Sequence, residues 1–222
     1  MHGTQALFSL AVKGEKIHRA PHIGMLQEHN IRTGFFEDHQ YEAMRAHLPA
    51  YVQPVVTFAF ITGWRVRSEV LTLQWRHVDF KAGIVRLDPG TTKNQEGRTF
   101  VMTPELRATL EAQRAVTEAT QKKIGSVILW VFHRTKRGRP LKSFRKAWQQ
   151  ACEAASVPGR ILHDLRRTAV RNLERAGVPC SVAMKMVGHK TESVYRRYAI
   201  VDEAMLRGAA VKRAAHRGQS PG

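Results

Sequence analysis

Residues 162–177 read LHDLRRTAVRNLERAG and predict an amphipathic helix that ends at a glycine. Apolar side chains recur every three or four residues, which is the spacing of one helix face, at Leu162, Leu165, Ala169, Leu173 and Ala176. His163 and Arg166 share a different face of the same helix. Gly177 supplies the expected stop. The helix therefore displays a histidine and an arginine together, although an isolated pair of this kind is more often a solvated basic surface.

Upstream of this helix, residues 55–61 form an apolar run that stops at Thr62 and Gly63. An apolar run before a glycine predicts a buried helix. Arg65 follows the glycine turn, where a planar guanidinium can be held rigidly and can grip two oxygens of a phosphate. Glu69 is placed to orient this arginine. The alternative is a purely structural ion pair.

The rest of the chain predicts further helices around a short β element. Residues 84–87 and 99–102 flank a polar connection and predict two antiparallel strands. The connection holds Lys93, and a lysine at a hairpin tip is usually only a solvated charge. The other elements expected are helices from Asp38 onward, at 68–75, 103–119, 143–155 and 182–187 and from Asp202 onward, and a strand at 127–132. The expected fold class is mainly α with a small antiparallel β-sheet (α+β).

Charge points to a polyanionic partner. The 222 residues hold 36 Lys and Arg against 18 Asp and Glu, which gives a formal net charge of +18 and makes nucleic acid the first candidate. Ribosomal and membrane-surface proteins are also basic. Residues 133–146 hold seven cations and no acid, and we expect them to follow a DNA backbone, through Arg134, Lys136, Arg137, Arg139, Lys142 and Arg145. The alternative is a solvated loop and helix face.

Several classes of protein are disfavoured by composition. No apolar run approaches the ~20 residues that a membrane span needs, and the first residues lack the order of a signal peptide, so a cytoplasmic protein is expected. Cys152 and Cys180 are too few for a disulfide framework and are interpreted as reduced packing residues. The acids form no convincing cluster for metal ions. No metal or cofactor is therefore expected.

One more motif follows the helix at 182–187. Gly188 is a helix stop followed by His189, and Tyr198 comes nine residues after that histidine. In their order and structural settings, the motifs around the arginine, the hairpin lysine, the His-x-x-Arg pair, the Gly-His pair and the tyrosine resemble the tyrosine recombinase (phage integrase) family over about residues 38–210. The resemblance implies these catalytic residues: Arg65, Lys93, His163, Arg166, His189 and Tyr198. It also implies that Glu69 is the family's acidic structural partner.

The sequence departs from the family pattern in two places. The first arginine commonly stands three residues before the glutamate, whereas Arg65 stands four before Glu69, so Arg67 is a rival for its role. The fixed spacing of Arg65 from the preceding helix favours Arg65. The family's usual N-terminal core-binding domain is also not recognisable. We therefore expect residues 1–37 to be its remnant and a linker, residues 38–210 to be the catalytic domain, and residues 211–222 to be a basic, disordered tail.

The resemblance implies a site-specific recombinase that cleaves and rejoins double-stranded DNA through a 3′-phosphotyrosyl intermediate, without metal or ATP. It also implies a homo-tetramer on DNA, in which the terminal helix from Asp202 onward docks on a neighbouring protomer. The alternatives are a DNA-binding protein without catalysis, a metal-dependent nuclease or transposase, a plain transcription factor and a type IB topoisomerase. The DNA site, and the choice between integration, excision and resolution, stay open.

Two tyrosines compete for the role of nucleophile. Tyr195 and Tyr198 are three residues apart and would share a helix face. Tyr198 lies at the family's usual distance from His189, whereas Tyr195 comes too early and is nearer the turn that begins at Thr191. Spacing therefore favours Tyr198.

Overall fold

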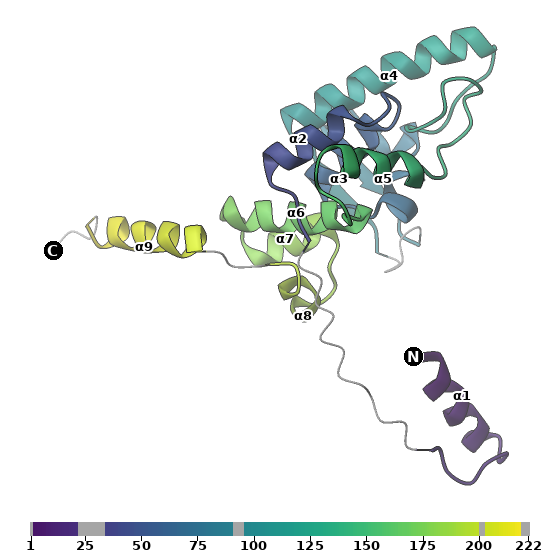
Figure 1. The fold of residues 1–222 in the computed structure, drawn as a ribbon, viewed down its shortest axis with the longest axis vertical. Helices are drawn as coiled ribbons and strands as arrows, with labels where there is room; N and C mark the ends of the chain where they lie inside the picture. The colour runs from purple at the N-terminus through teal and green to yellow at the C-terminus, as the bar shows by residue number, and fades with distance from the viewer. Residues whose placement is uncertain (1, 22–33, 91–95, 200–202, 219–222) are drawn as a thin grey trace. The chain divides into compact units, whose positions relative to one another are not determined.

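The computed structural model describes residues 2–21, 34–90, 96–199 and 203–218. The chain divides into two compact units, Met1–Arg32 and Thr33–Gly222, and Figure 1 shows the elements of both. Among the described residues, no helix is long and apolar enough to cross a membrane. The predicted domain limits at 37 and 210 stay predictions, but residues 211–218 of the expected disordered tail are helical. The elements are α1 His2–Lys13, α2 Asp38–Ala46, α3 Gln53–Thr62, η1 Val66–Val70, η2 Trp75–His77, β1 Val78–Asp79, β2 Ile84–Leu87, β3 Arg98–Val101, α4 Pro104–Ile124, α5 Arg145–Ala154, α6 Leu162–Arg175, α7 Cys180–Val187, α8 Glu192–Arg196 and α9 Glu203–Gly218.

The helix α3 is the buried centre of the second unit, as its apolar run predicts. It contacts α2, α4 and α6, and these helices surround it in Figure 1. Pro54 lies in the first turn, where no helical N–H is lost. The helix ends at Gly63 with a φ of 66°, a conformation that glycine adopts without a Cβ clash. Burial of apolar surface around α3 is the main stabilising contribution, and the core includes Val55, Val56, Phe58, Ala59, Leu106, Leu110 and Leu165.

A small antiparallel sheet packs on the side of this core. Its strand order is β1-β2-β3, and β2 pairs with β3 from Ile84 opposite Val101 to Leu87 opposite Arg98. The inward residues Val85, Leu87 and Phe100 are buried, whereas Arg86 is exposed, as the two-residue period of a strand requires. Both predicted strands are confirmed, the second one residue earlier than expected. The mainly α fold with a small antiparallel sheet is confirmed.

The helix predicted for residues 68–75 is wrong. The structure has one π-helical turn, η1, in which the N–H of Leu71 donates to the carbonyl of Val66, then a turn at residues 71–72 and extended backbone at Gln74, before η2 begins at Trp75. The extended segment arises because backbone groups of residues 73–75 bond residues 129–131 instead: Trp75 N–H donates to Leu129, and Val131 N–H donates to Leu73. An α-helix through residue 75 would withdraw those groups.

The strand predicted for residues 127–132 is also wrong. This segment makes a single bridge, Gln74 opposite Trp130, rather than a ladder. Its apolar residues are divided between core and surface, because Ile128, Val131 and Phe132 are buried whereas Val127 and Leu129 are exposed. The high density of apolar residues in this segment is therefore not evidence of a paired strand.

The remaining predicted helices are present with shifted ends. The helix α4 runs five residues beyond the expected end, to Ile124, and is capped at its start by Thr103, whose hydroxyl accepts the N–H of Leu106. The helices α6, α7 and α8 enclose a second, smaller core of Val170, Ala183, Val187 and Tyr195. Cys152 is buried and Cys180 is half-buried, and both are free.

Candidate active site

Arg166 is the buried centre of the candidate site and joins three segments. It lies on α6 with only 2% of its surface exposed. Its Nη1 donates to the carbonyl of Gly63 at 2.7 Å, where α3 ends, and to that of Val187 at 2.6 Å, where α7 ends. Its Nη2 lies 3.4 Å from the carbonyl of Gly188. Burial, together with the charge of Arg65, lowers the pKa of Arg166 to about 9, so the guanidinium is still charged at neutral pH.

His189 follows the end of α7 and is fixed by Arg166. The Nε2 atom of His189 accepts a hydrogen bond from Nε of Arg166 at 3.2 Å, so the neutral ring carries its proton on Nδ1. Nδ1 is buried and has no hydrogen-bond partner among the described residues. Burial and the positive charges of Arg166, Arg65 and Arg98 lower the pKa of His189 to about 3. The ring is therefore neutral near pH 7 and has one N–H to donate.

Arg65 is held beside this group by a buried carboxylate. Its Nη1 donates to Oε1 of Glu69 at 2.7 Å, and its backbone N–H donates to Oε2 of Glu69 at 2.7 Å. The Glu69 side chain is fully buried, whereas 26% of the Arg65 side chain stays exposed. The charge of Arg65 lowers the pKa of both His163 and His189. The rival Arg67 is exposed and lines a hollow that His163 also lines.

His163 and Tyr198 face each other directly. The Nε2 atom of His163, on the first turn of α6, lies 2.8 Å from the hydroxyl of Tyr198. The Tyr198 ring stacks on His189 with the ring centres 4.8 Å apart, and the guanidinium of Arg167 lies 5.3 Å from its centre. Burial and the charges of Arg166, Arg167 and Arg65 lower the pKa of His163. A neutral imidazole is the form that can accept the tyrosine proton.

Tyr195 lies in a different environment from Tyr198. Its side chain is 1% exposed within the smaller core, and its hydroxyl donates to the carboxylate of Glu174 on α6. Burial and this carboxylate raise the pKa of Tyr195. A raised pKa and a buried hydroxyl oppose formation of a nucleophilic phenolate.

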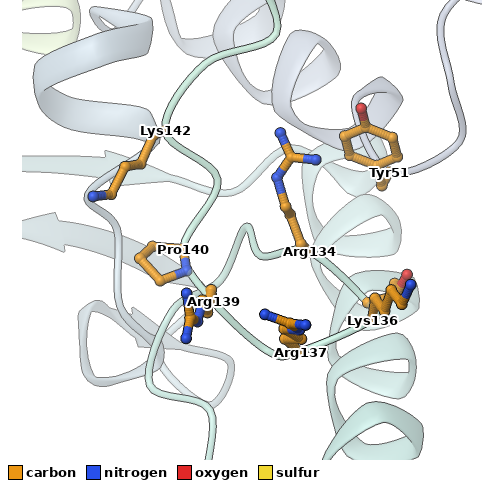
Figure 2. A pocket seen from close by; sticks show the side chains of 8 residues that line it. Tyr51, Arg134, Lys136, Arg137, Arg139, Pro140 and Lys142 are labelled. Carbon is orange, nitrogen blue, oxygen red and sulfur yellow. The ribbon is translucent and has the colours of Figure 1, made fainter.

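Four of the predicted DNA-binding cations, Arg134, Lys136, Arg137 and Arg139, lie on a hairpin-like loop, whereas Lys142 follows the loop and Arg145 begins α5. The loop is closed by an isolated bridge between His133 and Pro140 and by the N–H of Arg134 donating to Arg139 at 2.8 Å. Figure 2 shows the cations Arg134, Lys136, Arg137, Arg139 and Lys142 around one hollow. Its volume is about 730 Å³ and it is lined by Tyr51, Arg134, Thr135, Lys136, Arg137, Arg139, Pro140 and Lys142. The Arg134 guanidinium lies 5.9 Å from the centre of the Tyr51 ring.

A second hollow joins this basic loop to the catalytic residues. Lys142 lines both hollows. The second, of about 340 Å³, also includes the cations Arg67, Arg145 and Arg160, and it reaches His163. The structure thus brings together Arg65, His163, Arg166, His189 and Tyr198, with the basic loop as an adjoining surface. Lys93 lies outside the described residues.

Sequence reasoning missed Arg98, Arg160 and Tyr51 as parts of these surfaces. Arg98 begins β3 and is buried against Glu69. A cation at the start of an amphipathic strand was the available signal, but the sequence does not state which side chain faces the site. Tyr51 and Arg160 are far in sequence from the basic loop, so only the folded chain brings them near.

Residues 35–205 match the phage integrase family. The chain belongs to that family. This integrase-family chain is 27% identical over 193 residues to the integrase of Salmonella phage P22, in an alignment that covers 82% of this chain and 47% of that protein. It is 30% identical over 152 residues to the prophage integrase IntF of Escherichia coli strain K12, covering 67% of this chain and 30% of that protein. The chain spans less than half the length of these relatives.

Solved structures share the fold of this integrase-family chain. The Tn1549 transposon integrase in complex with a circular intermediate DNA superposes with a TM-score of 0.71 at 16% identity, over 93% of this chain and 76% of that chain. A lambda integrase dimer bound to a COC′ core site superposes with a TM-score of 0.62 at 17% identity, over 89% of this chain and 57% of that chain. At these identities the likeness establishes a common fold.

Proposed function

We propose that this chain is the catalytic part of a site-specific recombinase that cleaves and rejoins DNA through a 3′-phosphotyrosyl bond. The observation that supports this most directly is the 2.8 Å contact between the Tyr198 hydroxyl and Nε2 of His163, beside Arg65, Arg166 and His189. Membership of the phage integrase family supports the same reaction.

In the first step, Tyr198 attacks the scissile phosphorus and His163 accepts the phenolic proton. The new bond joins the tyrosine oxygen to phosphorus, and the bond to the 5′ oxygen of the DNA breaks. By family resemblance, Lys93 supplies the proton for that departing oxygen. Because one phosphate ester replaces another, rejoining is the same exchange in reverse with a 5′ hydroxyl as nucleophile. The cycle therefore needs neither ATP nor a metal.

Charge on the non-bridging oxygens is stabilised by the three fixed donors. Arg65 offers the exposed part of its guanidinium. Arg166 offers Nη2, because its Nε and Nη1 donate to His189, Gly63 and Val187, whereas Nη2 makes a longer contact of 3.4 Å with Gly188. His189 offers the N–H on Nδ1. Donors that are oriented before the reaction lose little by reorganisation as charge develops in the transition state.

The test is trapping of a covalent adduct on a pool of nicked DNA duplexes with a randomised centre, whose nick prevents rejoining. Wild type should accumulate adducts linked through a 3′ phosphate, in the presence of EDTA and without ATP. Tyr198→Phe should abolish them and leave DNA binding intact, because only one hydroxyl is removed. Tyr195→Phe, the matched control, should still form them. Adducts on Tyr195, or none in wild type that binds the DNA, would contradict the proposal.

Double-stranded DNA is the proposed partner, and we further propose a homo-tetramer on it. Solved relatives include integrases in complex with DNA. The helix α9 exposes Leu206 and Val211, with 62% and 69% of their surfaces accessible, which suits docking on a neighbouring protomer. Deleting the residues after Val201 should weaken assembly on DNA, measured by sedimentation, while one protomer still binds. Unchanged assembly of the truncated chain would contradict this role for α9.

A further inference from the structure

Arg98 is a buried cation that the proposed reaction leaves without a role. It begins β3, is 7% exposed, and directs Nη1 and Nη2 at both oxygens of Glu69, at 3.0 and 3.2 Å. Glu69 also accepts two hydrogen bonds from Arg65. One fully buried carboxylate is thus shared between two arginines from different elements. Sharing leaves this group of three with a net positive charge.

The other side of Arg98 meets the segment before His189. A Cβ added at Gly188 would overlap the guanidinium of Arg98, so this position accommodates only glycine, which its φ of 71° also favours. The guanidinium lies 5.5 Å from the Trp64 ring centre, and the indole N–H of Trp64 donates to the carbonyl of Met186 at 3.1 Å. Arg98 therefore packs between the turn that holds Arg65 and the end of α7.

We propose that Arg98 is a positioning residue that leaves part of the Arg65 charge available to the scissile phosphate and fixes the backbone before His189. This inference rests on the proposed recombinase function. Without Arg98, the whole negative charge of Glu69 would be paired with Arg65. The scissile phosphate would then face a neutral ion pair. A guanidinium suits this position because its two parallel N–H groups hold both carboxylate oxygens while its face packs on Trp64.

The pKa of His189 gives a second measure of the same arrangement. The positive charge of Arg98 is one cause of the lowered pKa of His189, after burial, Arg166 and Arg65. Removing that charge should raise the pKa of His189.

The experiment compares Arg98→Leu with Arg86→Leu, which removes an exposed cation from the neighbouring strand β2. Arg98→Leu should slow adduct formation about 100-fold with an unchanged Kd for DNA, and Arg86→Leu should not. In the double variant Arg98→Leu with Glu69→Gln, the carboxylate that would otherwise neutralise Arg65 is also removed. This variant should recover part of the rate of adduct formation that Arg98→Leu loses. A double variant no faster than Arg98→Leu would overturn the charge-sharing role.

Two further arms keep the outcomes distinct. If Arg98→Leu does not fold, Arg98→Gln, alone and with Glu69→Gln, replaces it, and the same recovery is expected because glutamine also removes the positive charge beside Glu69. An NMR titration of His189 should give a higher pKa in the Arg98 variant than in wild type or Arg86→Leu. If wild type forms no adduct, the recombinase proposal fails. The role of Arg98 is tested separately by the pKa of His189, and an unshifted pKa in the Arg98 variant would overturn it.

Discussion

At the scale of single residues, the contact between His163 and Tyr198 determines how the reaction depends on pH. Burial and three nearby arginines lower the pKa of His163 below its usual value, so the imidazole is neutral and able to accept a proton throughout the neutral range. A histidine outside such a positive environment would be partly protonated near pH 6.5.

Adduct formation by wild type should therefore stay high at neutral pH and decline as pH falls, at a lower pH than an ordinary histidine with a pKa of about 6.5 would give, because the pKa of His163 is lowered. The check is a single-turnover rate profile on the nicked substrate. His163→Gln should reduce the rate by about 100-fold. It should also remove the decline of the rate at low pH, the acid limb of the profile, because glutamine does not titrate. An acid limb that persists in His163→Gln would assign the titration to another group.

At the scale of elements, the end of α3 is the place where packing and the site meet. Gly63 has a φ of 66°, and an added Cβ would lie 3.0 Å from Cβ of Ala169 and 3.1 Å from a methyl of Val187. Its carbonyl accepts from Arg166 at 2.7 Å. Gly125 ends α4 with the same φ of 66°, but nothing lies within 4 Å of an added Cβ.

These two glycines allow backbone strain to be separated from crowding. Gly125→Ala should lower the free energy of unfolding by about 1 kcal/mol, the cost of the left-handed conformation. Gly63→Ala should add a further 1–3 kcal/mol or so because α6 and α7 must move apart, and it should also slow adduct formation by displacing Arg166. Chemical denaturation measures the free energy of unfolding of both variants. Equal costs at the two positions would show that crowding at Gly63 is relieved without strain.

At the scale of the whole molecule, the chain has a net charge of +18. Part of this charge forms a basic surface beside the site. Lys142 connects the hollow bordered by Arg134 and Arg137 with the one that reaches His163. A surface of this kind binds DNA largely by releasing counterions. Glu69 does not cancel the charge of this surface, because it is already shared by two arginines.

The affinity for duplex DNA should therefore fall steeply with salt, with a log-log slope of about −0.9 for each phosphate contacted. Lys142→Gln should reduce the steepness by about one such contact. Lys81→Gln changes an exposed cation in the turn between β1 and β2 and serves as the control. Fluorescence anisotropy over a range of salt concentrations measures both slopes. A slope unaffected by Lys142→Gln would remove this residue from the DNA surface.

The sequence alone determined the features that depend on local pattern. The apolar run before Gly63 predicted the buried helix, the stripe from Leu162 to Ala176 predicted α6, and alternation predicted the paired strands. The order and spacing of short motifs predicted the family, which the match over residues 35–205 confirms. These inferences succeed because periodicity and helix-stop glycines act within a few residues along the chain.

Only the tertiary structure decided which distant groups share a hydrogen bond or a charge. No α-helix reaches residue 75, because backbone groups of Leu73 and Trp75 bond residues 129–131 instead. Tyr195 and Tyr198 share a local motif, yet Glu174 holds one hydroxyl in the core while His163 meets the other. Arg98 lies beside Glu69 across 29 positions of sequence. Partners brought together by folding leave no periodic signal, because their interaction depends on distance in space rather than along the chain.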